Sequence, residues 1–400
     1  MKNLYKALII CLTFIFFIAT PVYGTETEGS TKDMSNMLIE AQEELDNDSR
    51  MEKFYKYISN LQMEDELLSG LNAKEYIANY LVNKEDSISF KDIGSSLISF
   101  LFREVKATLS LVVSILVIAL LSALLKNIQD AFSKDDGITS IAFFACYAVL
   151  IMLLSKSFLI SLDIAKEVFQ SIVEFMNVLV PVLIFLISSA GGITSALTID
   201  PIVLAAISIT PKIYTNLIFP LILIYLALLF ANNISKEFSI SGLCKFLKQT
   251  IMLSQGFILM VFVTILSIRG MTANTLDAVT KKSIKFAMDN FIPVVGKAFS
   301  DAISTLAACS LAMKSVISTL GVLILIVIAI YPIIKIFIVS MSLKLTGAIL
   351  EPVVDSKISG SVTMVGEALT LVMSCVICIS IMFFIMISMM ASSGKFIVGG

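Results

Sequence analysis

Residues 107–125 are ATLSLVVSILVIALLSALL, a run of 19 uncharged residues between Lys106 and Lys126. The hydrocarbon core of a bilayer is about 30 Å thick, and a helix needs about 20 apolar residues to cross it. This run therefore predicts a transmembrane helix. Further apolar runs, some of them weaker, lie at 138–155, 176–197, 213–231, 250–268, 315–334 and 368–394.

The seven runs together predict an all-α, polytopic helical membrane protein. Composition agrees, because 57% of the residues are hydrophobic and 15% are charged, against about 45–50% and about 25% in soluble domains. An eighth span is open at 331–350, where Pro332, Lys335 and Lys344 interrupt an otherwise apolar run. We therefore expect seven or eight transmembrane helices in a multi-pass domain over residues 107–394, followed by a tail at 395–400.

Residues 1–24 are typical of a signal peptide. Lys2 and Lys6 precede an apolar core at 7–19 that is too short to span a membrane, and Val22 and Gly24 stand at the positions that a signal peptidase reads. Cleavage after Gly24 would place the mature N-terminus outside the cytoplasm. An uncleaved anchor helix is the alternative.

Residues 25–106 form an acidic segment, with 17 Asp and Glu against 9 Lys and Arg. Short cytoplasmic loops tend to carry an excess of positive charge, so an acidic segment ahead of the first span indicates an extracytoplasmic location. Ser89 to Asp92 resembles a capping box, and apolar residues follow at helical spacing as far as Val105. We expect a small helical extracytoplasmic segment whose last helix lies along the membrane surface or continues into the first span.

Residues 269–314 form the connection with the largest basic content, and the alternation of spans places it in the cytoplasm if the run around Met176 crosses once. Apolar residues on one side of this segment predict an amphipathic helix at the interface, which Ile292-Pro293 ends and after which Gly296 permits a tight turn. The length and charge of this cytoplasmic loop suggest contact with a cytoplasmic partner.

Polar side chains recur at three- and four-residue intervals after the second run, so they share one face of a helix. This polar stripe consists of Asp163, Lys166, Glu167, Gln170 and Glu174. One interpretation is that it lines a wet cavity or a subunit contact, because ionisable groups at membrane depth are costly without a partner. The other is an amphipathic helix at the interface with its polar face in water.

Gly191 and Gly192 lie in a break in the helical pattern, within Ser188-Ser-Ala-Gly-Gly-Ile-Thr-Ser-Ala196. Broken helices at membrane depth mark substrate sites in many transporters. Small residues equally allow close helix packing, or form a loop. A secondary-transporter-like permease, with a polar path for a small solute at 163–192, is therefore an alternative function.

Histidine is absent from the whole chain, which excludes Ser-His-Asp triads, Cys-His pairs and histidine-bearing zinc sites. No Gly-x-Ser-x-Gly occurs, and Gly296-Lys297 lacks the glycine and the Ser/Thr of a phosphate-binding loop. Cys375 and Cys378 form a C-x-x-C within the last span, where two buried thiols on an apolar face are the better interpretation. We expect no enzyme activity, no cofactor, no metal site and no binding of nucleic acid.

Two patches of sequence resemble the stage III sporulation protein AE family. The first is Lys285-Phe-Ala-Met-Asp-Asn-Phe-Ile-Pro-Val-Val-Gly-Lys-Ala-Phe-Ser-Asp301, which continues through Met313-Lys-Ser and Leu320-Gly-Val. The second is the stretch 188–196 followed by Pro201-Ile. The resemblance covers roughly Ser89 to the last span. Its motif positions are Asn290, Pro293, Gly296, Lys297 and Asp301, and it carries over no catalytic residue.

The resemblance implies a membrane subunit of the channel complex that endospore-forming bacteria build between mother cell and forespore, needed for late forespore development. It implies as partners the other membrane proteins and the ring-forming proteins of that complex, including an ATPase-like subunit, and the lipid bilayer. It also implies a multi-pass location in a cell membrane, that of the mother cell around the forespore. A role as a non-enzymatic platform for assembly fits this resemblance best.

Overall fold

The computed structural model describes residues 45–64, 74, 76–77, 90–132, 137–191, 193–234, 240–291 and 296–393, which are helical apart from short turns. The signal peptide predicted at 1–24 and the tail at 395–400 lie outside these residues. The described elements are α3 (Ser49–Glu64), α5 (Phe90–Phe132), α6 (Gly137–Ser189), α7 (Ile193–Ile213), the π-helix η1 (Tyr214–Ile218), α8 (Phe219–Ile234), α9 (Ser241–Phe291), α10 (Gly296–Leu350) and α11 (Ser356–Ser392).

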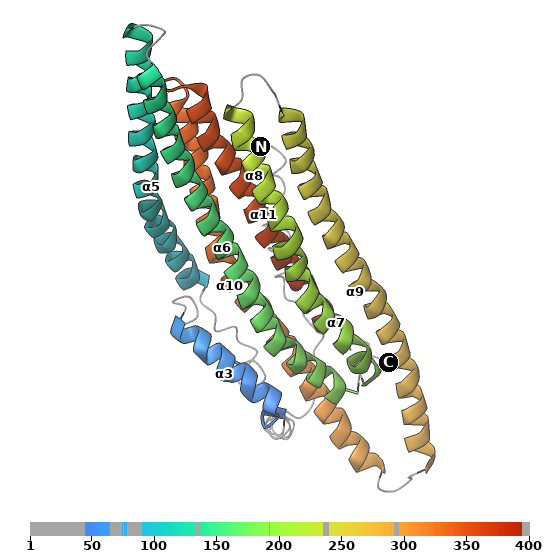
Figure 1. Cartoon of the computed structure of the whole chain (residues 1–400). Coiled ribbons are helices and arrows are strands. Elements are labelled where there is room, and N and C mark those ends of the chain that lie inside the picture. Colours follow the sequence, from blue (N-terminus) through green and yellow to red (C-terminus); the bar gives the residue numbers. More distant parts are fainter. Residues whose placement is uncertain are drawn as a thin grey trace.

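Long antiparallel helices form the molecule, and α3 lies beside α6 at one end of the bundle (Figure 1). We call this the α3 end; the turn at 351–355 and the start of α9 lie at the opposite end (Figure 1). α11 packs against α6, α8, α9 and α10, which makes it the central helix. The rod formed by α7, η1 and α8 is continuous despite Pro201 and Pro211, and the π-helical turn begins at Tyr214, three residues after Pro211.

The fold class predicted from the sequence is confirmed, but the expected seven or eight spans are wrong for the described residues. Six helical segments are long and apolar enough to cross a membrane. The runs at 138–155 and 176–197 belong to α6 as far as Ser189, because the polar stretch between them contains no proline or glycine. α10 likewise passes through Pro332 without a break, so 331–350 is not a separate eighth span.

The acidic N-terminal segment packs against α6 through its helix α3. The Arg50 guanidinium lies 4.3 Å from the centre of the Phe185 ring, and the rings of Tyr57 and Phe175 are 6.0 Å apart. At the start of α3, the Arg50 side chain donates a hydrogen bond to Asp48, which lowers the pKa of that carboxyl. α5 begins at Phe90 and continues without interruption into the first span, as one of the two alternatives expected.

Residues 269–314 do not form a long loop. They include the last part of α9 and the first part of α10, and residues 292–295 between these parts lie outside the described residues. Four crossings separate α3 from the end of α9, and both lie at the α3 end (Figure 1). An extracytoplasmic N-terminal segment is therefore inconsistent with a cytoplasmic location of residues 269–314. The sequence-based prediction of opposite sides assumed five crossings between the two segments.

Glycines allow α10 and α11 to approach closely. A Cβ atom built on Gly366 would lie 2.9 Å from the backbone oxygen of Ser340 and 2.8 Å from Cγ of Lys344. One built on Gly347 would lie 2.1 Å from Oγ1 of Thr363 and 3.0 Å from the backbone oxygen of Ser359. Small residues at a crossing let membrane helices gain contact through close backbone packing.

Candidate functional site

α11 carries a row of partly buried polar side chains on the face that contacts its neighbouring helices. Glu367, Thr370, Ser374 and Cys378 follow one another at intervals of three or four residues, so they share one face of the helix. This interior polar row meets polar side chains of α9, α10 and η1. The interior row, unlike the stripe on α6, joins several helices.

The charged part of the interior row consists of two lysines and one carboxylate. Lys248 Nζ of α9 lies 2.7 Å from Glu367 Oε2, and Lys344 Nζ of α10 donates to Thr370 Oγ1 at 2.6 Å. Lys344 is also within electrostatic range of both Glu367 and Lys248. All three charged groups lie within candidate spans, where ionisable residues are costly unless they have partners and often mark function.

The neutral part of the interior row centres on the buried amide of Gln255 in α9. Ser374 Oγ donates to Gln255 Oε1 at 3.0 Å, and Gln255 Nε2 donates to Cys375 Sγ at 3.2 Å. Tyr214 of the π-helical turn donates its hydroxyl to Cys378 Sγ at 3.0 Å. The C-x-x-C thiols are free, as expected, but both accept hydrogen bonds instead of making only apolar contacts.

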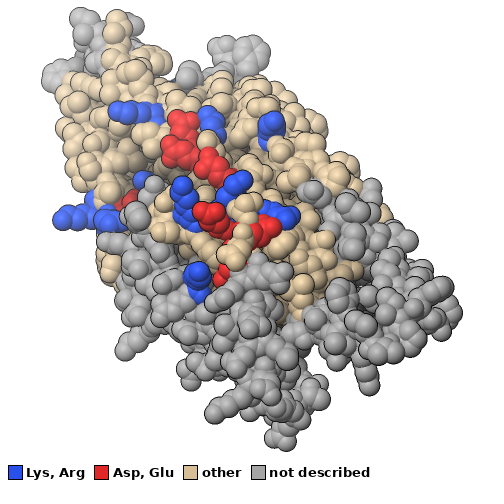
Figure 2. Space-filling model, turned by 90° about the horizontal axis from the view of Figure 1, so that it is seen from below, with Lys and Arg blue, Asp and Glu red and all other residues tan. Residues whose placement is uncertain are grey.

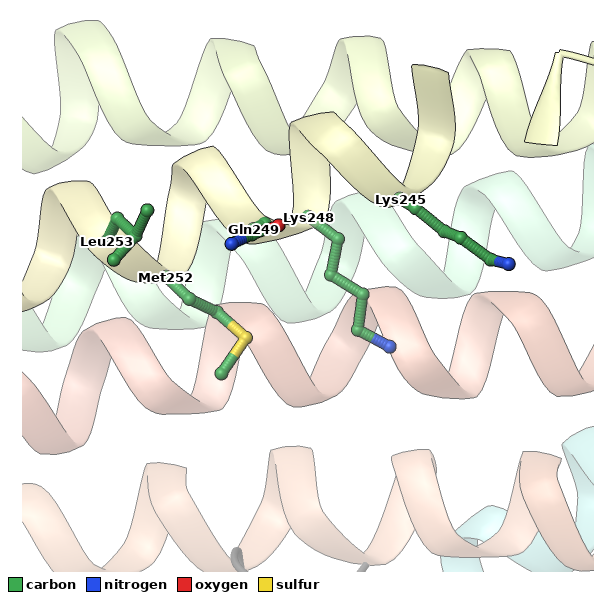
Figure 3. Close-up of a pocket in the computed structure, with 5 residues that line it drawn as sticks. All are labelled: Lys245, Lys248, Gln249, Met252 and Leu253. Atoms are coloured by element: carbon green, nitrogen blue, oxygen red, sulfur yellow. The ribbon is translucent and has the colours of Figure 1, made fainter. Parts of the chain in front are cut away.

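A pocket of about 490 Å³ opens beside the charged part of the row. It is lined by Lys245, Lys248, Gln249, Met252 and Leu253. Figure 3 shows these side chains along α9, with the lysines towards one end and Met252 and Leu253 towards the other. The pocket thus combines cationic and apolar groups.

An ion pair between Lys126 and Asp355 joins the end of α5 to the turn between α10 and α11. The Asp355 carboxylate also accepts from the backbone N–H of Lys357 at 2.8 Å and so caps α11. Burial of Asp355 by itself would raise its pKa. The hydrogen bonds and the charges of both lysines together outweigh this effect and hold the pKa below its ordinary value.

We expect the charge of Asp355 to stabilise the protein at neutral pH and to lose this effect in acid. A lowered pKa gives stability that is present above the unfolded-state value, about 3.9, and is lost as the pH falls through the folded-state value. Asp355→Asn keeps a good N-cap residue but should lower stability at pH 7 by about 1 kcal/mol, since the pair is partly exposed.

The measurement is the thermal unfolding temperature of wild type and Asp355→Asn in detergent from pH 7 to pH 3. The gap between the two proteins should narrow as the pH falls. A gap of constant size would mean that the charge of Asp355 contributes nothing.

The polar stripe predicted on α6 lies on the outside of the bundle. Its residues Asp163, Lys166, Glu167, Gln170 and Glu174 are all exposed or partly exposed. Lys166 Nζ is 2.9 Å from Asp163 Oδ1, and Gln170 Nε2 donates to Glu174 Oε1 at 2.9 Å. The opposite face of the same turns is buried and apolar, with Leu162, Ala165, Phe169, Ile172 and Phe175.

The predicted helix break is a turn between two antiparallel helices. α6 ends at Ser189, Gly191 has φ 88°, a backbone conformation that favours glycine, and α7 begins at Ile193. Gly192 lies outside the described residues. The turn lies at the α3 end of the bundle (Figure 1), so it does not interrupt a helix partway along its length.

Four of the five family motif positions lie in the last turn of α9 and the first turns of α10, at the same end of the bundle (Figure 1). Asn290 is in the last turn of α9, and Gly296, Lys297 and Asp301 are in the first two turns of α10. Pro293 is outside the described residues, and the helix end predicted at Ile292-Pro293 agrees with the end of α9 at Phe291.

The sequence contained a signal for the interior charges that its interpretation missed. The predicted spans 250–268 and 368–394 begin just after Lys248 and Glu367, so these charges counted as flanking residues. In the structure, α9 and α11 begin several residues before them, at Ser241 and Ser356. No group of three or more His, Cys, Asp or Glu that could hold a metal occurs in the described part of the chain.

Comparisons with known proteins agree on one family. Residues 71–394 match the family described as Stage III sporulation protein AE. The chain is 28% identical over 314 residues, 78% of each chain, to Stage III sporulation protein AE of Bacillus subtilis (strain 168). No solved structure matches the chain.

Proposed function

Because this chain belongs to the stage III sporulation protein AE family, its role lies in sporulation, and we propose that it is a membrane subunit of the channel complex linking mother cell and forespore. In this proposal it serves late forespore development as a non-enzymatic platform. It sits in the mother-cell membrane around the forespore and binds the other membrane proteins and the ring-forming proteins of the complex, including an ATPase-like subunit.

The single observation that carries the proposal is the outward orientation of the polar stripe on α6. Up to Ile160 the exposed face of α6 is largely apolar, with Ile141, Phe144, Val149 and Met152. From Asp163 onwards it is polar. A surface against acyl chains is apolar, whereas a polar surface faces water or another protein. This orientation supports contact with a neighbouring subunit over a path within one chain.

The position of α3 also supports a contact with another subunit at this surface of α6. α3 covers α6 from Phe175 to Phe185, directly after the stripe. α3 carries exposed Glu52, Lys53 and Lys56, and the view from below shows acidic and basic side chains close together (Figure 2). If the signal peptide directs the N-terminus outwards, the α3 end lies in the space between the two membranes, where ring-forming proteins could bind the stripe.

The permease alternative gains no support from these positions. Its path at 163–192 would need the stripe to face the interior of the chain, and the stripe lies on the outer face of α6. The break at Gly191 is a turn at the end of α6. A channel path, in this proposal, forms between subunits.

Charge removal on the stripe tests the proposal in sporulating cells. Asp163→Asn, Glu167→Gln and Glu174→Gln, combined in one variant, keep side-chain size and remove three charges. In a strain that lacks the native protein, we expect this variant to insert at the wild-type level but to co-purify less of the complex and to leave a late forespore-specific reporter dark after engulfment is complete. Glu351→Gln, an exposed carboxylate at the opposite end, is the matched control.

Two outcomes would contradict the proposal. If cells without the protein make normal spores, the channel role is wrong. If the triple variant loses the reporter while the complex remains fully assembled, the stripe acts in transport through the chain and not in subunit contact.

A further inference from the structure

The pocket on α9 has the charge of an anion-binding site. Lys245 is exposed and makes no ion pair with a residue that the structure describes, and Lys248 has Glu367 as its partner. Lys344 is within electrostatic range of the same carboxylate. Two ammonium groups therefore act on one carboxylate, Lys245 adds a further positive charge, and the region carries an excess of positive charge that attracts an anionic group.

The pocket also lies near the start of the candidate span Ser241–Ile268, where a lipid headgroup would lie. α9 begins at Ser241, so Lys245 and Lys248 lie about 6 Å and about 10 Å along the helix from its start at a rise of 1.5 Å per residue. The N-terminus of a helix adds a positive partial charge near these lysines. Basic residues close to the membrane surface attract anionic headgroups.

The surface beyond the lysines is apolar and open. Met252 and Leu253 form the other end of the pocket (Figure 3), and Phe257 and Met260 continue the exposed face of α9. Free phosphate would use only the lysines and Gln249. A phospholipid would use both ends of the pocket, with its phosphate at the lysines and an acyl chain along the apolar residues.

We propose that this pocket binds one anionic phospholipid, with the phosphate held by Lys245, Lys248 and Gln249 and an acyl chain against Met252 and Leu253. The negative charge of the lipid phosphate balances the excess positive charge of the lysines, and the acyl chain covers the outer face of α9. This inference rests on α9, α10 and α11 alone and is independent of the proposed channel role.

The test is native mass spectrometry of the full chain after reconstitution in nanodiscs of phosphatidylcholine and phosphatidylglycerol in equal amounts. Wild type should retain phosphatidylglycerol in preference to phosphatidylcholine. Lys245→Gln should lower this retention about fivefold, as expected for one basic residue near a membrane surface. Lys156→Gln, which removes an exposed lysine of α6, should leave it unchanged.

Three results would overturn the proposal. Equal retention of both lipids by wild type would show that the pocket does not select an anion. An equal loss in Lys156→Gln and Lys245→Gln would show attraction by overall charge. Complete displacement of phosphatidylglycerol by excess inorganic phosphate would show that the acyl chain adds nothing to binding. Equal unfolding temperatures in phosphatidylcholine alone confirm that both variants fold.

Discussion

Replacing Gly366 with leucine is expected to destabilise the protein by about 3 kcal/mol or more, the upper range for overpacking in a core. Even the first carbon of the new side chain would lie 2.9 Å from the Ser340 backbone oxygen and 2.8 Å from Lys344 Cγ. The backbone atom cannot rotate away, so α10 and α11 must separate. Their contact is the most extensive between any two described helices, and separating them also removes the Lys344–Thr370 hydrogen bond.

Gly256→Leu is the matched control for this substitution. Gly256 lies within α9, and a Cβ atom there would meet no atom within 4 Å. Leucine also has a higher helix propensity than glycine, by up to about 1 kcal/mol. Unfolding in nanodiscs should therefore show a large loss of stability for Gly366→Leu and none for Gly256→Leu. Equal stability of both variants would mean that α10 and α11 do not pack as described.

Glu367→Ala is expected to cost about 1 kcal/mol, the upper range for a partly exposed ion pair. The substitution leaves Lys248 and Lys344 without the carboxylate whose charge offsets theirs. The side chains of Lys248 and Glu367 are 39% and 45% exposed, so water and headgroups screen the pair, and the loss stays well below that of a fully buried charge. Repulsion between the lysines should loosen α9 and α10 from α11.

A charge swap distinguishes the contribution of the Lys248–Glu367 ion pair from a general effect of substituting either residue. Lys248→Glu combined with Glu367→Lys restores one opposite pair between α9 and α11 and should recover part of the stability lost in either single variant. Thermal unfolding in nanodiscs measures all four proteins as a double-mutant cycle. A cycle without coupling would show that the ion pair contributes nothing beyond its separate residues.

The fold class was predictable because uncharged runs of 19 residues and more are typical of membrane-spanning helices and rare in soluble domains. The number of spans was not, since a hydropathy pattern does not distinguish a polar turn from a helix that continues with one polar face. Asp163 to Glu174 suggested an interruption, whereas α6 runs through it and turns these residues outwards. Pro332 suggested a boundary, but α10 continues through it.

The interior polar row was harder to predict, because it depends on which helices are neighbours. Lys248 and Glu367 are 119 positions apart in the chain, and only the parallel packing of α9 and α11 brings them together. The hydrogen bond from Tyr214 to Cys378 likewise depends on the tertiary contact between η1 and α11. In the sequence alone, where the neighbouring helices are unknown, each of these residues is a single polar group in or near an apolar run.

The length of the helices has a mechanical consequence. α10 contains 55 residues, which gives about 80 Å at 1.5 Å per residue, and a tilt of 40° still leaves roughly 60 Å across the membrane. A bilayer with its headgroups is only about 40–45 Å thick. α10 thus extends beyond the lipid as one continuous helix. A rotation of this helix at the turn near Asp355 would also move its other end, where the motif residues Gly296 and Lys297 lie.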